Sequence, residues 1–242
     1  MAQLSIAALS VSYGGVRAVQ SVSFDVPSGA VTGLIGPNGA GKSSMINAIT
    51  GLLRPAGGSV TIDGRELVGL SPGQILDAGV ARTFQQAQLS PGMTVEQNLC
   101  LPLLLQAGMR AAQQRAGELA TTLGIESIMS LPAASISFGA RRLVEIGRAL
   151  MRRPAILLLD EPGAGLTSIE KVKLVALLKE LARAGSAVLL VDHDMRLVMG
   201  ACDSVVVLDA GVVIAEGSPE HVRRDPAVVE AYLGKLDPHG PH

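Results

Sequence analysis

The chain has 242 residues and a net charge of −1, from 20 Lys and Arg against 21 Asp and Glu. This balance argues against a general nucleic-acid-binding protein, which usually carries a basic excess or a basic stripe. Hydrophobic residues make up 48% of the chain, yet no apolar run reaches the roughly 18 residues that a membrane-spanning helix needs. The N-terminus lacks a basic segment followed by an apolar stretch, so no secretion signal is expected. The two cysteines, Cys100 and Cys202, lack metal-site spacing and are expected to be reduced cytosolic thiols.

The first sixty residues predict a small antiparallel sheet. Three short strand candidates, residues 4–12, 21–26 and 59–63, are bounded by Gly, Pro and Asp-Gly turn signals. This sheet is expected to form a flap beside the main body of the protein.

Three apolar runs, residues 30–35, 155–159 and 187–191, predict the strands of a second sheet. Each run is continuously apolar or β-branched, as expected for strands that are buried on both faces. Because helix candidates alternate with these strands, this sheet is expected to be largely parallel and covered by helices. The fold class is therefore predicted to be α/β.

The middle of the chain, from about residue 95 to residue 130, predicts a helical lobe inserted into the α/β core. Thr94, with Gln97 three residues later, forms a capping box that opens this stretch. Gly108 and Gly124 are expected to end helices, because glycine readily adopts the left-handed conformation found there.

A further long helix is predicted to follow a cap at Ser168. Its predicted buried face consists of Val172, Val175, Leu178 and Leu181. Beyond this helix, the turn at residues 209–211 is expected to join two short strands, 205–208 and 212–215.

Residues 36–44 fit the phosphate-loop pattern G-x-x-x-x-G-K-[ST], between a predicted strand and a predicted helix. The loop consists of Gly36, Pro37, Asn38, Gly39, Ala40, Gly41, Lys42, Ser43 and Ser44. Its glycines let backbone N–H groups surround a phosphate, and the helix N-terminus adds partial positive charge. Lys42 is expected to contact the β- and γ-phosphates, and Ser43 to offer its hydroxyl to Mg²⁺. This motif alone leaves a transporter ATPase, a GTPase, a kinase and a recombinase open.

Two adjacent acids, Asp160 and Glu161, end the apolar run at residues 155–159. The carboxyl end of a buried strand is where open α/β sheets bind ligands. Asp160 is therefore expected to hold Mg²⁺, directly or through water, and Glu161 to orient and deprotonate the attacking water.

Residues 136–142, Ile-Ser-Phe-Gly-Ala-Arg-Arg, resemble the signature segment of ATP-binding-cassette (ABC) proteins, usually written L-S-G-G-Q. Other landmarks of that family occur in the family order. Tyr13 stands where an adenine-stacking aromatic is expected, and Gln85 stands in the glutamine loop. Residues 165–167 resemble the D-loop, and His193 matches the switch histidine.

The resemblance implies a P-loop NTPase of the ABC cassette type, with a mostly parallel core sheet, an antiparallel β subdomain and an inserted helical subdomain. The whole chain, residues 1–242, is expected to be one ABC ATPase domain. Residues 1–85 and 153–242 are expected to form the core with its flap, and residues from about 86 to 152 the helical subdomain. The implied ligands are ATP and Mg²⁺, with Gln85 contacting the metal and sensing the partner, and His193 contacting the γ-phosphate.

The implied assembly is a homo- or heterodimer with a second ABC ATPase, in which Ser137 and the N–H groups near Gly139 cover the nucleotide of the opposite subunit. The helix that carries Arg141 is expected to begin near that residue and to point its positive end at the phosphate. A groove around residues 86–93 is expected to receive transmembrane permease subunits on the inner face of the cell membrane, with a solute-binding protein as an indirect partner and no nucleic acid.

The segments 79–85, 195–200 and 227–234 resemble the ATPase subunits of branched-chain amino acid importers, a pattern that urea and amide importers share. Phe138, Ala140 and Thr167 depart from the usual family residues and put communication across the dimer in question. The alternatives are a GTPase, a small-molecule kinase, a DNA-repair cassette and a scaffold that binds ATP without turnover. The chain lacks an Asn-Lys-x-Asp guanine-reading segment and the long insertions of repair cassettes.

Overall fold

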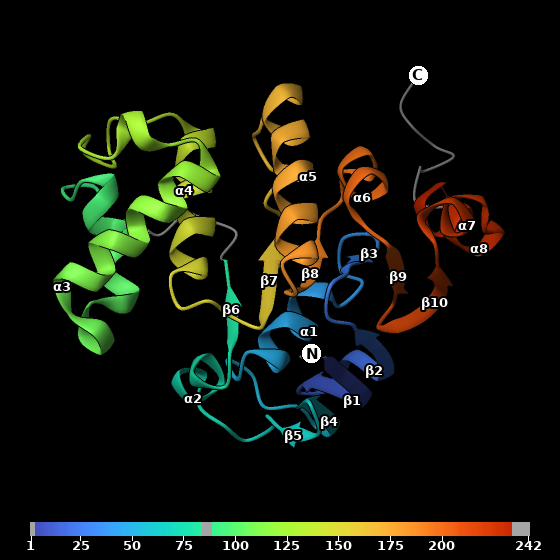
Figure 1. Ribbon diagram of the computed structural model, residues 1–242. Coiled ribbons are helices and arrows are strands. Elements are labelled where there is room, and N and C mark those ends of the chain that lie inside the picture. Colours follow the sequence, from blue (N-terminus) through green and yellow to red (C-terminus); the bar gives the residue numbers. More distant parts are fainter. Residues whose placement is uncertain (1–2, 84–88, 234–242) are drawn as a thin grey trace.

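The computed structural model describes residues 3–83 and 89–233, which form two β-sheets and the helices around them (Figure 1). The strands are β1 (Leu4–Tyr13), β2 (Val16–Val26), β3 (Val31–Ile35), β4 (Gly57–Ile62), β5 (Arg65–Glu66), β6 (Val80–Arg82), β7 (Ile156–Asp160), β8 (Ala187–Val191), β9 (Ser204–Asp209) and β10 (Val212–Gly217). The helices are α1 (Lys42–Ile49), α2 (Pro72–Asp77), α3 (Val95–Leu123), the 3-10 helix η1 (Glu126–Ile128), α4 (Phe138–Leu150), α5 (Ser168–Arg183), α6 (Met195–Ala201), α7 (Pro219–Arg224) and α8 (Pro226–Leu233).

The larger sheet has the strand order β10-β9-β3-β8-β7-β6, and the smaller sheet has the order β2-β1-β4-β5. In the described part of the chain, the larger sheet is parallel except for its edge pair β9–β10, and the smaller sheet is antiparallel throughout. Helices α3 and α4 form a lobe at one end of the larger sheet (Figure 1). The predicted α/β class, with an antiparallel subdomain and an inserted helical part, is confirmed.

The parallel strands separate two hydrophobic cores. In β7, Leu157 and Leu159 belong to the core shared with α3, α4, α5 and α6. Ile156 and Leu158 point the other way, into the core shared with α1 and the antiparallel sheet. Side chains alternate between the faces of a strand, so a strand covered on both faces needs an apolar residue at every position. This requirement explains the continuous apolar runs in the sequence.

Helix α3 of the helical lobe begins and ends at the predicted signals. Thr94 accepts a hydrogen bond from the Gln97 amide, and the Gln97 side chain accepts one from the Thr94 amide, which together form the predicted capping box. Gly108 interrupts α3 with non-helical backbone angles, φ 78° and ψ 170°. Gly124 ends α3 in the left-handed conformation, at φ 65°. Both predicted stops are confirmed.

Helix α5 differs from its prediction at the cap and on its buried face. Thr167, not Ser168, caps the helix, because its hydroxyl accepts from the Glu170 amide within a capping box. The side chains buried by α5 are those of Leu174, Leu177, Leu178 and Ala182. Of the predicted face, Leu178 is buried and Val175 and Leu181 pack partly buried against the core, but Val172 is 70% exposed. The predicted apolar stripe is therefore confirmed at Leu178 and wrong at Val172. Contact with the sheet, rather than the spacing of apolar residues alone, selects the buried face.

Both cysteines are free thiols and both are buried. Burial raises the pKa of Cys202 to about 12, and burial also raises the pKa of Cys100. Since the thiolate is the reactive form of cysteine, this environment disfavours reaction at either thiol. None of the helices in residues 3–83 and 89–233 combines the length and the hydropathy of a membrane-spanning segment.

Candidate functional site

The phosphate loop leaves the end of β3 and enters α1, as predicted, in a conformation that requires glycine. Gly36, Gly39 and Gly41 have φ values of 151°, 84° and 105°. A Cβ atom at Gly36 would lie 2.1 Å from the carbonyl oxygen of Leu208, and a Cβ atom at Gly41 would lie 2.3 Å from that of Ala18. The loop is therefore pressed against neighbouring backbone, which fixes its curvature. Helix α1 has no side-chain cap at Gly41, so its first amides are available to an anion.

Lys42 turns its ammonium group back into the loop. Its Nζ donates to the carbonyl oxygens of Gly36 at 2.7 Å and Pro37 at 3.0 Å, and the residue is 9% exposed. A mostly buried ammonium group is costly unless it is hydrogen-bonded, and the loop carbonyls provide that stabilisation. A polyphosphate in the loop would give this cation acceptors that are negatively charged, which form stronger hydrogen bonds than carbonyls do.

The two predicted acids end β7 in different environments. Asp160 is buried, at 5% exposure, and its Oδ2 accepts from the Arg82 guanidinium at 3.0 Å. Burial raises the pKa of Asp160, and the hydrogen bond from Arg82 opposes this rise. Glu161 is partly open, with a side-chain exposure of 24%. Its φ of 48° is uncommon for a residue other than glycine, and such strained backbone is concentrated at functional sites.

His193 lies beside Glu161. The Nδ1 atom of His193 is 3.6 Å from Oε1 of Glu161, and its side chain is 63% exposed. The two residues follow neighbouring parallel strands, in which Asp160 of β7 pairs with Val191 of β8. The intervening Asp192 is buried and accepts from the amides of Gly163 and Asp194, which holds both turns together. A carboxylate and an imidazole thus meet at one edge of the sheet, a pairing suited to proton transfer.

The signature segment opens helix α4. The Ser137 hydroxyl accepts from the Ala140 amide at 3.2 Å, so the helix begins at Phe138 rather than near Arg141 as expected. The reason is that Ser137 is itself a good N-cap residue. A Cβ atom at Gly139 would lie 2.0 Å from a carboxylate oxygen of Glu170. Helix α4 therefore lies against the Glu170 carboxylate of the α5 capping box, and a larger residue at 139 would have to displace that side chain.

The remaining predicted residues lie at the margins of this region. Tyr13 ends β1 and is 48% exposed, so its ring is open to a planar ligand. Phe138 is 53% exposed, with the guanidinium carbon of Arg142 5.6 Å from its ring centre. Gln85 and the first part of the expected groove at 86–93 lie outside the described residues.

Sequence reasoning missed Arg82, which pairs with Asp160 in the structure. A basic residue at the end of one parallel strand and an acid at the end of another would have been the signal, but nothing in the sequence shows that β6 and β7 are neighbours. Thr83 was also missed, and its hydroxyl accepts from the Asp160 amide at 3.3 Å.

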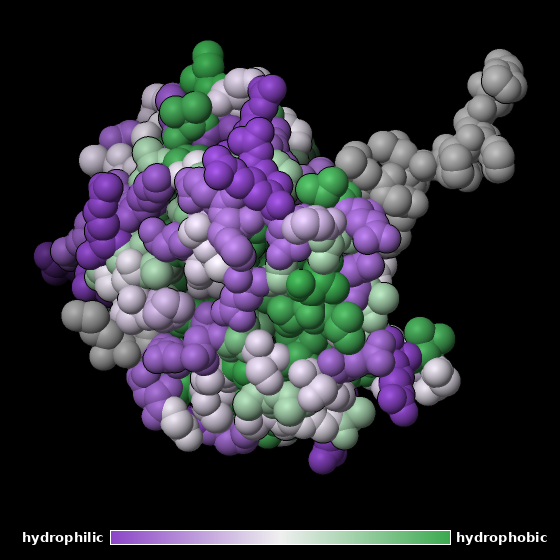
Figure 2. Space-filling model, turned by 90° about the vertical axis from the view of Figure 1, so that its right-hand side faces the viewer, coloured by the Kyte–Doolittle hydropathy of each residue, from purple (hydrophilic) through white to green (hydrophobic). Residues whose placement is uncertain are grey.

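Tyr232 on α8 is a further residue that the sequence did not reveal. Its hydroxyl oxygen is buried and has no hydrogen-bond partner of good geometry among the described residues. Burial raises the pKa of Tyr232, and the nearby backbone of Gly36 opposes this rise. The C-terminal helix therefore reaches back to the first residue of the phosphate loop. Figure 2 shows the face of the molecule that carries the last two helices, α7 and α8, and an apolar area on this face is bordered by polar side chains.

Replacing Tyr232 with Phe is expected to raise the melting temperature by about 2–4 °C, because it removes a buried hydroxyl whose desolvation costs about 1 kcal/mol. Differential scanning calorimetry without nucleotide measures this change. Tyr13→Phe removes the hydroxyl of an exposed ring and serves as the control, and its melting temperature is expected to equal that of the unsubstituted chain. A lower melting temperature for Tyr232→Phe would show that the hydroxyl is hydrogen-bonded in solution.

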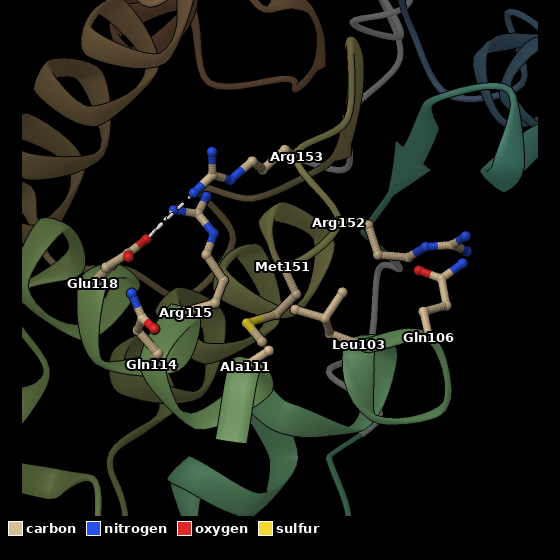
Figure 3. Close-up of a pocket in the computed structure, with 9 residues that line it drawn as sticks. All are labelled: Leu103, Gln106, Ala111, Gln114, Arg115, Glu118, Met151, Arg152 and Arg153. Carbon is tan, nitrogen blue, oxygen red and sulfur yellow. Dashed lines mark hydrogen bonds and ion pairs between the residues drawn. The ribbon is translucent and has the colours of Figure 1, made fainter. Parts of the chain in front are cut away.

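A separate cavity of about 330 Å³ lies between α3 and the turn that follows α4 (Figure 3). Arg115 and Arg153 both approach Glu118, at 3.0 Å and 3.6 Å. Arg152 extends to the other side of the cavity, and it pairs with Asp77 of α2. The Arg115–Glu118 pair lies within α3, whereas the pairs made by Arg152 and Arg153 join the helical lobe to the core. No predicted site residue lines this cavity.

The donor chemistry at the phosphate loop fits a magnesium nucleotide. Mg²⁺ prefers oxygen ligands and usually binds through one or two carboxylates together with substrate phosphates. A hydroxyl at Ser43 and a carboxylate at Asp160 supply this type of ligand. Among residues 3–83 and 89–233, no cluster of three or more His, Cys, Asp or Glu side chains forms a metal cage.

Comparisons with known proteins agree with this geometry. A family model described as ABC transporter matches residues 19–164, and one described as Branched-chain amino acid ATP-binding cassette transporter matches residues 212–237. The chain is 38% identical to the high-affinity branched-chain amino acid transport ATP-binding protein LivG of Salmonella typhimurium, over 96% of this chain and 98% of the relative. It is 37% identical to BraF of Pseudomonas aeruginosa, with the same coverage. It is 35% identical to the lipopolysaccharide export system ATP-binding protein LptB of Haemophilus influenzae, over 97% of this chain and 98% of that protein.

Solved structures give the same result. A nucleotide-free ATP-binding cassette from an ABC transporter is 31% identical and superposes with a TM-score of 0.89, covering 97% of this chain and 100% of the other. The ADP conformation of an ATP-binding cassette has a TM-score of 0.88 at 31% identity, with the same coverage. The chain therefore belongs to the ABC transporter family, as an ATP-binding subunit that hydrolyses ATP.

Proposed function

We propose that this chain powers an importer of branched-chain amino acids, or of related small polar solutes such as urea and amides. The match of residues 212–237 to the branched-chain amino acid cassette family carries this proposal. The names of LivG and BraF, which are similar along nearly their whole length, support it. A scaffold without turnover is not favoured, because these relatives are named transport proteins and Glu161 and His193 lie together at the site.

The nucleotide would be held by the phosphate loop and by Tyr13. Amides of residues 36–44 and the Lys42 ammonium would bind the phosphates, and the Tyr13 ring would stack on adenine. Mg²⁺ would be held by Ser43, Gln85 and Asp160, where it would neutralise charge on the β- and γ-phosphates. The glycines at 36 and 41 support this assignment, since no other residue fits where the loop curves.

Hydrolysis would depend on Glu161, with His193 and Gln85 as its neighbours at the γ-phosphate. Glu161 would accept a proton from the attacking water as its oxygen approaches phosphorus. His193, 3.6 Å away, would donate a hydrogen bond to the γ-phosphate and keep the carboxylate oriented. The partial exposure of both side chains supports these roles, because water and substrate must reach them.

The active unit would be a dimer bound to a permease on the inner face of the membrane. ABC transporter ATPase subunits work as dimers with membrane permeases, and the homo- or heteromeric pair proposed here would bury each nucleotide between two chains. Ser137 and Gly139 of one chain would cover the γ-phosphate held by the other. The signature segment begins α4 with its positive end, which supports this contact.

The groove around residues 86–93, beside the helical subdomain at about 86–152, would receive the permease, and the core at 1–85 and 153–242 would carry the nucleotide. ATP binding would close the pair and hydrolysis would let it part, because only the triphosphate contacts both chains.

Uptake by the source cells tests this function. Deleting the gene is expected to lower the uptake of radiolabelled leucine, and a plasmid copy is expected to restore it, whereas a Glu161→Gln copy is not. Urea and acetamide uptake in the same strains separates the two solute classes. Unchanged uptake of all three solutes would refute the proposal.

A further inference from the structure

The guanidinium of Arg82 joins three elements around the expected metal site. Its Nη2 donates to Oδ2 of Asp160 at 3.0 Å. Its Nη1 donates to Oδ1 of Asn47 on α1 at 2.7 Å and lies 3.4 Å from Oγ1 of Thr50, the residue that caps the C-terminus of α1. The side chains of Arg82 and Asp160 are only 10% and 6% exposed. A planar fork of this kind fixes its acceptors in direction as well as in distance.

Arg82 is also the last residue of β6, at the boundary between the core and the helical lobe. It pairs with Leu158 of β7 in the parallel ladder. It lines a cavity of about 180 Å³ with Pro102 of α3 and Glu145 of α4. The same side chain therefore contacts the phosphate-loop helix, the carboxylate that ends β7, and the space beside the lobe.

A divalent cation at Asp160 would have to share this carboxylate with the guanidinium. Two positive charges a few ångströms apart repel each other, and in a site this buried the repulsion is screened less than in water. The ion pair also holds the carboxylate in place before a metal arrives. Arg82 thus favours the correct position of Asp160 and opposes the binding of a second cation there.

We propose that Arg82 is a positioning residue that holds Asp160 in the metal-free site and competes with Mg²⁺ for it, so that metal binding loosens the link from β6 to β7. The inference rests on the proposed role of Asp160 as a metal ligand. Coupling between two interactions at one carboxylate is reciprocal. Bound Mg²⁺ therefore weakens the Arg82–Asp160 ion pair by the same factor by which the ion pair lowers the affinity for Mg²⁺.

Metal affinity tests the proposal directly. Mn²⁺ replaces Mg²⁺ as the probe, and its free concentration is read by electron paramagnetic resonance with the full chain and saturating AMP-PNP. Arg82→Gln, which removes the charge but keeps a hydrogen-bonding amide, is expected to tighten Mn²⁺ binding by about fivefold or more. Arg152→Gln, which breaks the ion pair with Asp77, is the control and is expected to leave the affinity for Mn²⁺ unchanged.

A second measurement uses the unsubstituted protein, so the proposal stays testable if Arg82→Gln does not fold. The ¹⁵N side-chain signal of Arg82, assigned by its loss in Arg82→Lys, is expected to shift when Mg²⁺ is added to the AMP-PNP complex. Unchanged or weaker Mn²⁺ binding by a folded Arg82→Gln, or an unmoved Arg82 signal, would overturn the inference. Failure of the unsubstituted chain to bind AMP-PNP at all would instead refute the proposed nucleotide site.

Discussion

Lys42→Ala is expected to weaken ATP binding at least about 100-fold, below detection in an isothermal titration. Lys42 is 9% exposed, and its ammonium group is held inside the loop by the carbonyls of Gly36 and Pro37. Without the Lys42 side chain, the backbone amides of the loop could still bind the phosphates, but the loop would have no residue with a full positive charge. A charge-assisted hydrogen bond in a buried site contributes more than any neutral donor that remains.

The matched control for this prediction is Lys179→Ala, which removes an exposed lysine of α5 and the same number of side-chain atoms. ATP affinity of this variant is expected to equal that of the unsubstituted chain. Circular dichroism of both variants checks that each is folded. Wild-type affinity for ATP in a folded Lys42→Ala protein would contradict the role assigned to Lys42 and the proposal that residues 36–44 bind a polyphosphate.

Most strands and the site motifs were predictable because each is contiguous in the sequence. The exceptions are β5 and β6, which were not predicted, and β2, which begins at Val16 rather than at residue 21. The strand at 187–191 has the predicted bounds, since five consecutive aliphatic residues are typical of a strand that is covered on both faces. The phosphate loop, Asp160 and Glu161 were found in the same way. Local patterns identify such segments because backbone geometry and side-chain chemistry are both set within a few residues.

Contacts between distant segments were not predictable. Apolar residues of α5 occur at spacings that allow more than one buried stripe, and only packing against the sheet selects Leu174 over Val172. The pairing of Arg82 with Asp160 depends on β6 lying beside β7, an order that no single sequence gives. The same holds for the approach of Tyr232 to the phosphate loop.

Glu161→Gln is expected to leave ATP binding intact and to slow hydrolysis by about 10²-fold or more. Glutamine has nearly the same shape as glutamate, so the strained turn at φ 48° and the neighbouring His193 can keep their positions. What is lost is the group that accepts a proton from water. A colorimetric phosphate-release assay gives the rate, and isothermal titration gives the affinity.

Glu180→Gln, on the exposed face of α5, is the control and is expected to hydrolyse ATP at the normal rate. The two variants should differ in assembly as well. If hydrolysis is what lets the subunits part, ATP should hold Glu161→Gln as a dimer in size-exclusion chromatography, whereas Glu180→Gln should return to its nucleotide-free state. Normal turnover by Glu161→Gln would mean that another group takes the proton, and the partly exposed imidazole 3.6 Å away would be the first to test.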